Sequence, residues 1–202
     1  MTSCPAMILA GGRGMRLGQR DKALCVLGGA SLLQHCCTRL STQCDPLALN
    51  ANGDLERFSD FEIPVIADSA GDHFGPLAGV LAAMDWAAKL GHGDVVTVAV
   101  DTPFFPHDLV AKLQAQRAPN TIALAATRDA EGRLWRHPTF GLWPTHLRDD
   151  LRAALSSGTR KVTEWADRQG ATYVTFKTTP NDPFFNINTP EDLEQAEKLI
   201  RV

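Results

Sequence analysis

Glycines and basic side chains are concentrated in residues 9–22, directly after a short apolar run. The glycines of this stretch are Gly11, Gly12, Gly14 and Gly18. Its basic residues are Arg13, Arg16, Arg20 and Lys22, in a chain whose net charge at pH 7 is -3. Glycine lacks the Cβ atom that would hold a polyanion away from backbone N–H groups, and the basic side chains add positive charge. The pattern therefore predicts a phosphate-binding loop; the alternative is a solvated basic turn without a ligand.

The spacing of these residues excludes two common phosphate-binding loops. A dinucleotide-binding fingerprint needs G-x-G-x-x-G, but the third glycine position counted from Gly12 is occupied by Leu17. A P-loop needs Gly-Lys-Ser/Thr, whereas Lys22 lies between Asp21 and Ala23. The P-loop hydroxyl that binds magnesium is therefore missing. A metal ion bound with the phosphates must find its protein ligand elsewhere in the chain.

Three further polar residues, Asn50, Asp68 and Asp101, each follow an apolar run that is expected to form a strand. In an open parallel sheet the carboxyl ends of the strands meet at one edge, so we expect these side chains to lie beside the phosphate loop. Each carboxylate could instead cap the following helix, but Pro103 and Pro106 delay the helix after Asp101. Asp101 is therefore the predicted Mg²⁺ ligand, because magnesium binds nucleotides through one or two carboxylates together with phosphate oxygens.

A site of this kind is suited to nucleotidyl transfer. The loop glycines and Arg16 would hold a triphosphate, and Lys22 would neutralise charge near the α-phosphate. Mg²⁺ on Asp101 would stabilise the departing pyrophosphate. An incoming phosphate is already an anion, so no protein nucleophile is needed. The predicted catalytic residues are Asp101, Lys22 and Arg16.

Apolar periodicity predicts alternating strands and helices behind this edge. The expected strands are residues 6–9, 46–49, 64–67, 94–100, 121–126, 139–143 and 172–176. The expected helices are residues 31–43, 75–88, 107–116, 145–155, 161–169 and 191–199. The run 94–100 is the most continuous apolar stretch and suits a central strand that is buried on both faces. The alternation predicts one three-layer α/β/α domain over residues 1–202, with a mostly parallel, Rossmann-like central sheet.

The composition, 44% hydrophobic and 21% charged, is typical of a globular chain. The sequence has neither an apolar run of about 18 residues nor a signal-peptide pattern, so we expect no membrane span and a cytoplasmic location. Nucleic-acid binding is not expected, because the basic cluster is confined to one loop.

Five cysteines are present without a C-x-x-C pair, and we expect reduced thiols. Cys36 and Cys37 fall at helical spacing within residues 31–43, which favours core packing over metal binding. The six histidines are scattered without zinc-like spacing, so no transition-metal site is predicted.

Leu9-Ala10-Gly11-Gly12, with Arg16 and Asp21-Lys22, resembles the signature of the molybdenum cofactor guanylyltransferases. This family belongs to the nucleotide-diphospho-sugar transferase-like group. Sugar-1-phosphate nucleotidyltransferases share the opening motif but differ in the approach to the lysine. The resemblance continues in order along nearly the whole chain, through residues 50–52, 75–79, 101–103, 137–139 and 186–190. One departure is Gln19, where the family often has a second glycine, and it affects only the expected shape of the loop.

The resemblance implies residue roles and substrates that the chemistry alone does not supply. The implied GTP contacts are Leu9, Ala10, Gly11, Gly12, Lys22, Asn50, Asp68 and Asp101, with Asp101 also holding Mg²⁺, or Mn²⁺ in its place. The implied molybdopterin contacts are Asn186, Asn188, Arg160 and Lys161. The N-terminal part would thus bind GTP and the C-terminal part molybdopterin. Asn188 could instead belong only to the start of the last helix.

The implied reaction transfers GMP from Mg-GTP to the terminal phosphate of molybdopterin, releasing pyrophosphate. Cofactor-delivery proteins and apo-molybdoenzymes are candidate partners. Two alternatives remain open at this point: a nucleotidyltransferase that uses CTP or another phosphorylated acceptor, and a non-catalytic GTP-binding regulator.

Overall fold

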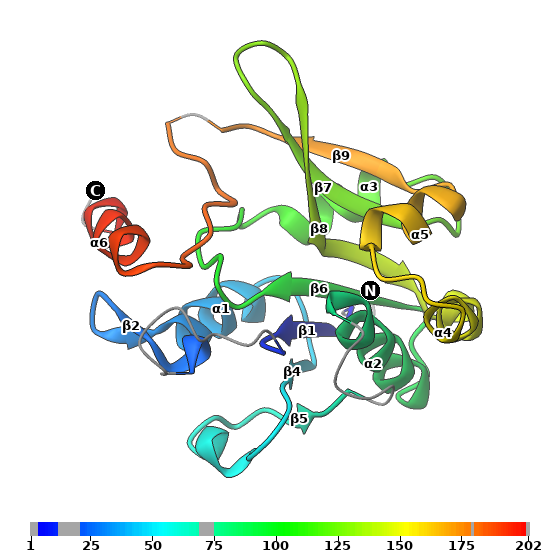
Figure 1. The fold of residues 1–202 in the computed structure, drawn as a ribbon, viewed down its shortest axis with the longest axis horizontal. Helices are drawn as coiled ribbons and strands as arrows, with labels where there is room; N and C mark the ends of the chain where they lie inside the picture. Colours follow the sequence, from blue (N-terminus) through cyan, green and yellow to red (C-terminus); the bar gives the residue numbers. More distant parts are fainter. Residues whose placement is uncertain (1–3, 12–20, 69–74, 179, 201–202) are drawn as a thin grey trace.

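The computed structural model describes residues 4–11, 21–68, 75–178 and 180–200. In this part of the chain, seven strands form one sheet in the order β5-β4-β1-β6-β8-β7-β9 (Figure 1). Their bounds are β1 Ala6–Leu9, β4 Leu47–Asn50, β5 Val65–Ile66, β6 Asp94–Ala99, β7 Ala123–Arg128, β8 Leu134–Pro144 and β9 Thr172–Phe176. All seven predicted strands therefore form, with ends that differ by a few residues.

Most neighbouring strands of this sheet are parallel. β1 pairs in parallel with β4 and β6, β4 with β5, and β7 with β9. β8 is the exception, because it runs antiparallel to both β6 and β7. The register places Leu9 beside Asn50 on one side and beside Ala99 on the other. The chain therefore leaves β1, β4 and β6 at the same edge of the sheet, as the sequence predicts.

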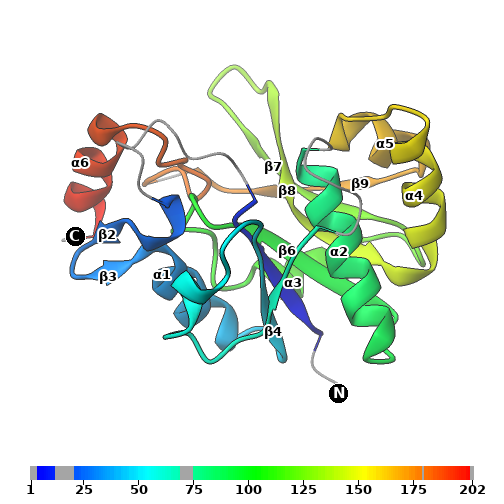
Figure 2. The same ribbon diagram turned by 60° about the horizontal axis from the view of Figure 1, so that its bottom comes forward.

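Helices cover both faces of the sheet and complete the predicted three layers (Figure 2). The helices are α1 Leu32–Ser41, α2 Pro76–Lys89, α3 Leu109–Gln116, α4 Arg148–Ser156, α5 Val162–Arg168 and α6 Pro190–Leu199. Buried residues of α1 and α3 pack with Ala6 and Ile8 in one core. Buried residues of α2, α4 and α5 pack with Met7 and Leu9 in the other. Alternate side chains of β1 thus point into opposite cores, as expected for a central strand.

The structure departs from the sequence-based prediction at two places. A short antiparallel hairpin, formed by β2 (Val26–Leu27) and β3 (Ala30–Ser31), was not predicted. Its strands have only two residues each, which is too short for a pattern in the sequence. β8 begins at Leu134 rather than at residue 139, and continues past Pro138 because the pairing with β7 shifts between Leu124 and Ala125. Proline fits there because it lacks the N–H that a regular ladder requires.

The cysteines behave as core residues. None of the five, all of which lie in the described part of the chain, forms a disulfide, and Cys36 is fully buried in α1. Burial raises the pKa of the Cys36 thiol well above its usual range, so the thiol stays protonated. None of the helices that the structure describes combines the length and apolar character needed to cross a bilayer.

Candidate active site

A cavity of about 260 Å³ lies where β1, β4, β5 and β6 end. It is lined by Leu9, Ala10, Gly11, Lys22, Asn50, Asp68, Gly75, Pro76, Gly79, Ala99, Val100, Asp101 and Thr139. These residues come from the ends of β1, β4 and β6, from the segments that follow β1, β5 and β6, from the start of α2 and from β8. The cavity therefore forms at the sheet edge where strand-end geometry predicts a ligand site.

One end of the cavity is built from two amides and a carboxylate. Asn50 is 2% exposed, and its side-chain Nδ2 donates to Asp68 Oδ1 at 2.9 Å and to the backbone oxygen of Ile66 at 3.0 Å. Asn52 donates from Nδ2 to Asp68 Oδ2 at 2.8 Å and accepts from the Asp68 backbone N–H at 2.9 Å. The Asp68 carboxylate is therefore held in a fixed orientation while it lines the cavity.

Two glycines allow the backbone to approach this amide cluster. A Cβ at Gly79, in the first turns of α2, would lie 2.5 Å from Asn50 Oδ1, which is closer than real contacts allow. A Cβ at Gly11 would lie 3.4 Å from the same oxygen. Gly79 thus lets α2 pack directly on Asn50, and the absence of a side chain at Gly11 leaves space above the cluster.

The other end of the cavity carries Lys22 and Asp101. Lys22 is the first residue of η1 (Lys22–Leu24), and its Nζ donates to Asp101 Oδ2 at 3.0 Å and to Asn188 Oδ1 at 2.7 Å. The side chains of Lys22 and Asp101 are 17% and 24% exposed, so the ion pair is only partly screened by water. The structure thus brings together three segments that are far apart in sequence.

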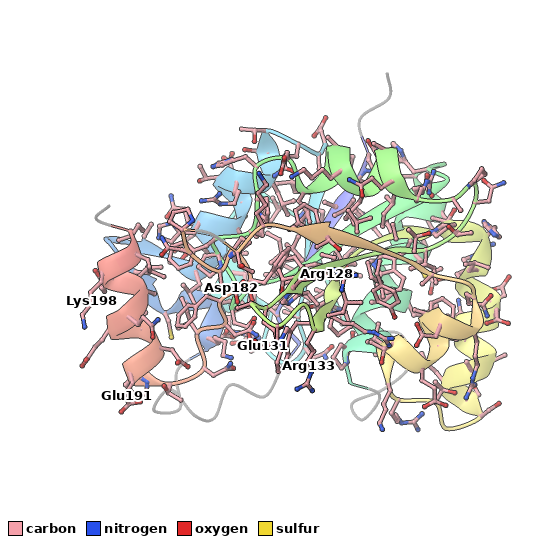
Figure 3. All side chains as sticks on the ribbon, turned by 90° about the horizontal axis from the view of Figure 1, so that it is seen from above. Arg128, Glu131, Arg133, Asp182, Glu191 and Lys198 are labelled. Carbon is pink, nitrogen blue, oxygen red and sulfur yellow. The ribbon has the colours of Figure 1, made fainter. Side chains whose placement is uncertain are left out.

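The segment before α6 closes this end of the site. The backbone N–H of Ile187 donates to the Asp101 backbone oxygen at 2.8 Å. The buried Thr102 hydroxyl lies 3.1 Å from Asp101 Oδ1 and also contacts Asn186 Oδ1. Figure 3 shows the preceding part of this segment, marked by Asp182, between the β7–β8 hairpin and α6. Asn186 and Asn188, on either side of Ile187, are therefore held at the Lys22–Asp101 end of the site.

A second cavity, of about 530 Å³, is lined in part by this segment. Its lining includes Asn186, His137, Phe184, Arg128 and Asp182. His137 stacks on Phe184 with ring centroids 4.2 Å apart, and burial lowers the pKa of its imidazole. Asn186 lines this cavity and is linked through the Thr102 hydroxyl to Asp101, which lines the first cavity.

Asp101 has the chemistry of a magnesium ligand. Its carboxylate is a hard oxygen donor that lines the cavity and remains partly exposed. Among the described residues, no three His, Cys, Asp or Glu side chains come together as a metal-binding group. A cation held by Asp101 would therefore complete its coordination with phosphate oxygens and water, which is the mode that Mg²⁺ prefers with nucleotides.

The structure brings most of the predicted site residues together. Seven of the predicted GTP contacts line the first cavity: Leu9, Ala10, Gly11, Lys22, Asn50, Asp68 and Asp101. Asn186 and Asn188 lie at the Asp101 end of the site through the contacts described above. Gly12 and Arg16 lie outside the described residues.

Arg160 and Lys161 are not brought to either cavity. They lie between α4 and α5, whereas α6 lies at the opposite end of the long axis of the molecule in Figures 1 and 2. Arg160 donates to the backbone oxygens of Leu155 and Thr159. Arg160 and Lys161 therefore lie towards the other end of the molecule from the segment before α6 that carries Asn186 and Asn188.

Sequence reasoning did not select Asn52 and Thr102 as site residues. Asn52 lies two positions after Asn50. Residues two apart in an extended segment point to the same side, so this spacing could have predicted that Asn52 lies beside Asn50 in the site. Thr102 adjoins Asp101 in sequence, but its contact with Asn186 joins residues 84 positions apart. No local pattern could indicate that contact.

The layer order and the polar cavity at the strand ends are typical of a nucleotide-binding α/β domain, and the comparison with known families identifies the class as a nucleotidyltransferase. Residues 6–172 match the MobA-like NTP transferase domain family, and the chain belongs to this family. The chain is 47% identical to the molybdenum cofactor guanylyltransferase of Bradyrhizobium sp. (strain ORS 278), over 98% of this chain and 93% of that protein. It is 49% identical to the protein of the same name from Rhizobium leguminosarum bv. trifolii, over 96% and 91%.

Solved structures show the same fold at lower identity. The molybdopterin-guanine dinucleotide biosynthesis protein A of Archaeoglobus fulgidus has a TM-score of 0.72 and 23% identity, covering 98% of each chain. The 2-C-methyl-D-erythritol 4-phosphate cytidylyltransferase of Thermus thermophilus has a TM-score of 0.71 and 19% identity, covering 100% of each chain. Because the two are named for different nucleotides, the fold does not decide which base is used, and that choice rests on the sequence relatives.

Proposed function

We propose that this protein transfers GMP from Mg-GTP to the terminal phosphate of molybdopterin, forming molybdopterin guanine dinucleotide and pyrophosphate. The observation that carries the proposal is the single cavity that contains Gly11, Lys22, Asn50, Asp68 and Asp101. Relatives at 47% and 49% identity, named molybdenum cofactor guanylyltransferases, support the choice of GTP and of molybdopterin. The reaction would take place in the cytoplasm.

The residues of the cavity would act by orientation and charge stabilisation. An oxygen of the acceptor phosphate forms a bond to the α-phosphorus of GTP while the bond from that phosphorus to the bridging oxygen of pyrophosphate breaks. Lys22 would stabilise negative charge on the α-phosphate, and backbone N–H groups near Gly11 would face the triphosphate. A Mg²⁺ ion held by Asp101 would supply a Lewis acid for the same phosphate oxygens.

Asn50 and Asp68 would orient the nucleotide at the other end of the cavity. Their side chains are fixed by the contacts with Asn52 and Ile66, so little ordering would accompany binding. The acceptor would approach from the side of Asn186 and Asn188, because these residues adjoin Asp101 and Lys22. Donor and acceptor would then meet at the Lys22–Asp101 end of the site.

The proposal is tested by supplying wild-type protein with molybdopterin, Mg²⁺ and either GTP or CTP, and analysing the products by mass spectrometry. We expect the guanine dinucleotide with an equal amount of pyrophosphate, and much slower transfer from CTP. Faster transfer from CTP would favour the cytidylyltransferase alternative. Binding of GTP without pyrophosphate release would favour a non-catalytic regulator and contradict the proposed function.

A further inference from the structure

Arg57 connects two parts of the site that are separate in sequence. It lies in η2 (Glu56–Phe58), in the connection between β4 and β5 that is drawn in cyan at the lower left of Figure 1. Its Nε donates to Asp21 Oδ2 at 2.6 Å, and its Nη2 donates to the Asn52 backbone oxygen at 2.9 Å. Nη1 donates to the backbone oxygen of Asp54. The three nitrogens of one guanidinium therefore donate hydrogen bonds to three different residues.

The contact with Asp21 lies at the start of the turn that carries Lys22. The other carboxylate oxygen of Asp21, Oδ1, accepts from the Ala23 backbone N–H at 2.9 Å and caps η1. Lys22 is the first residue of this short helix, so the orientation of the Asp21 carboxylate influences where the lysine side chain begins. Arg57 and Asp21 are 27% and 22% exposed in their side chains, which places the ion pair partly out of water.

The contact with Asn52 anchors the same guanidinium to the opposite end of the cavity. Asn52 holds Asp68 through both ends of its side-chain amide. The guanidinium carbon of Arg57 also lies 4.4 Å from the centroid of the buried Phe58 ring, and this cation–π contact restrains the guanidinium further. The Arg57 guanidinium that binds Asp21 is thus restrained by its contacts with Asn52 and Phe58.

We propose that Arg57 is a positioning residue, which fixes the Lys22 turn relative to the Asn52–Asp68 end of the cavity through its ion pair with Asp21. The described lining of the cavity contains Lys22 and Asp68 but not Arg57, so the effect on the reaction passes through other side chains. A lysine cannot replace this residue, because one ammonium group on a flexible chain lacks the planar fork that reaches Asp21 and Asn52 together.

The inference rests on the proposed function and is tested with Arg57→Gln, Arg57→Lys and Asp21→Asn, each in the wild-type and the Lys22→Ala background. Removing partners that orient active groups typically costs about 10- to 100-fold, so we expect at least about a tenfold lower kcat/KM for Arg57→Gln. Arg57→Lys should recover little of this loss. Asp21→Asn should produce a similar loss, and should add little to Arg57→Gln. In the Lys22→Ala background, Arg57→Gln should have almost no further effect, because the residue on which it acts is already gone.

The control is Arg152→Gln, which removes another arginine–aspartate pair, with Asp85 on α2, outside the site. We expect this variant to match the wild type. Thermal unfolding of every variant shows whether a loss of activity comes from misfolding or from misplacement of Lys22. If Arg57→Gln is unstable, Asp21→Asn tests the same ion pair with a smaller change of side chain. Unchanged kcat/KM in a folded Arg57→Gln protein, or an equal loss in the Lys22→Ala background, would overturn the positioning role.

A failure of the proposed function would give a different result from a failure of the role proposed for Arg57. Wild-type protein that makes no guanine dinucleotide would overturn the function itself. GTP affinity, measured by isothermal titration, would then still test Arg57: weaker binding in Arg57→Gln but not in Arg152→Gln supports the positioning role, and equal binding contradicts it.

Discussion

Asp101→Ala should lower kcat by about 10²- to 10³-fold, which is the loss typical of removing one preorganised transition-state stabiliser. The substitution removes the carboxylate proposed to hold Mg²⁺ and the partner of Lys22, which lies 3.0 Å from Asp101 Oδ2. Asp101→Asn keeps the size of the side chain and should still be strongly impaired, because a neutral amide is a poor magnesium ligand. The measurement is initial rate against Mg²⁺ concentration at saturating GTP.

A matched control is available at the N-terminus of α3, where Asp108 precedes the helix. Asp108 pairs with Lys112 at 2.9 Å, but this ion pair lies on the surface, with side chains 55% and 40% exposed. Asp108→Ala should leave kcat unchanged, since exposed pairs contribute little even to stability. A near-normal rate for Asp101→Ala at saturating GTP and limiting Mg²⁺ would refute the role assigned to this carboxylate.

Lys22→Ala should also lower kcat by about 10²- to 10³-fold, because it removes the positive charge proposed to act at the α-phosphate. Unlike the Asp101 variants, it should not weaken the apparent affinity for Mg²⁺. Lys22 is not a metal ligand, and its loss frees the Asp101 carboxylate from an ion pair. Rate measurements over a series of Mg²⁺ concentrations separate the two variants.

Lys112→Ala is the corresponding control, since it removes a lysine from an exposed pair. It should match the wild type in kcat and in Mg²⁺ dependence. If Lys22→Ala instead behaved like this control, the lysine would serve only to hold Asp101 and Asn188 in place, and the proposed stabilisation of the α-phosphate would be wrong.

The fold could be predicted because its strands are continuous apolar runs and its helices have clear ends. The run 94–100 is β6 at the centre of the sheet, and Thr189 caps α6 with Asp192 in a capping box. The β2–β3 hairpin was missed because two-residue strands carry no detectable alternation. The expected strand 139–143 begins five residues too late, because β8 starts at Leu134 and continues through Pro138, which the shifted register accommodates.

The site was predictable where it depends on strand ends and not where it depends on long-range contacts. Asn50 ends β4, and Asp68 and Asp101 follow β5 and β6, so one topological rule was enough to place them together. The contact of Lys22 with Asn188 joins residues 166 positions apart, and that of Arg57 with Asp21 joins residues 36 positions apart. Such pairs depend on how loops meet in space, which local sequence patterns do not encode.

A crystal structure of the wild-type protein with GTP and Mg²⁺, without acceptor, tests the central claim most directly. We predict the triphosphate between the loop at Gly11 and the Asp101 carboxylate, with the ion on Asp101, Lys22 turned towards the α-phosphate, and the nucleoside beside Asn50 and Asp68. GTP bound away from this cavity, with the Lys22–Asp101 pair remote from every phosphate, would contradict the account.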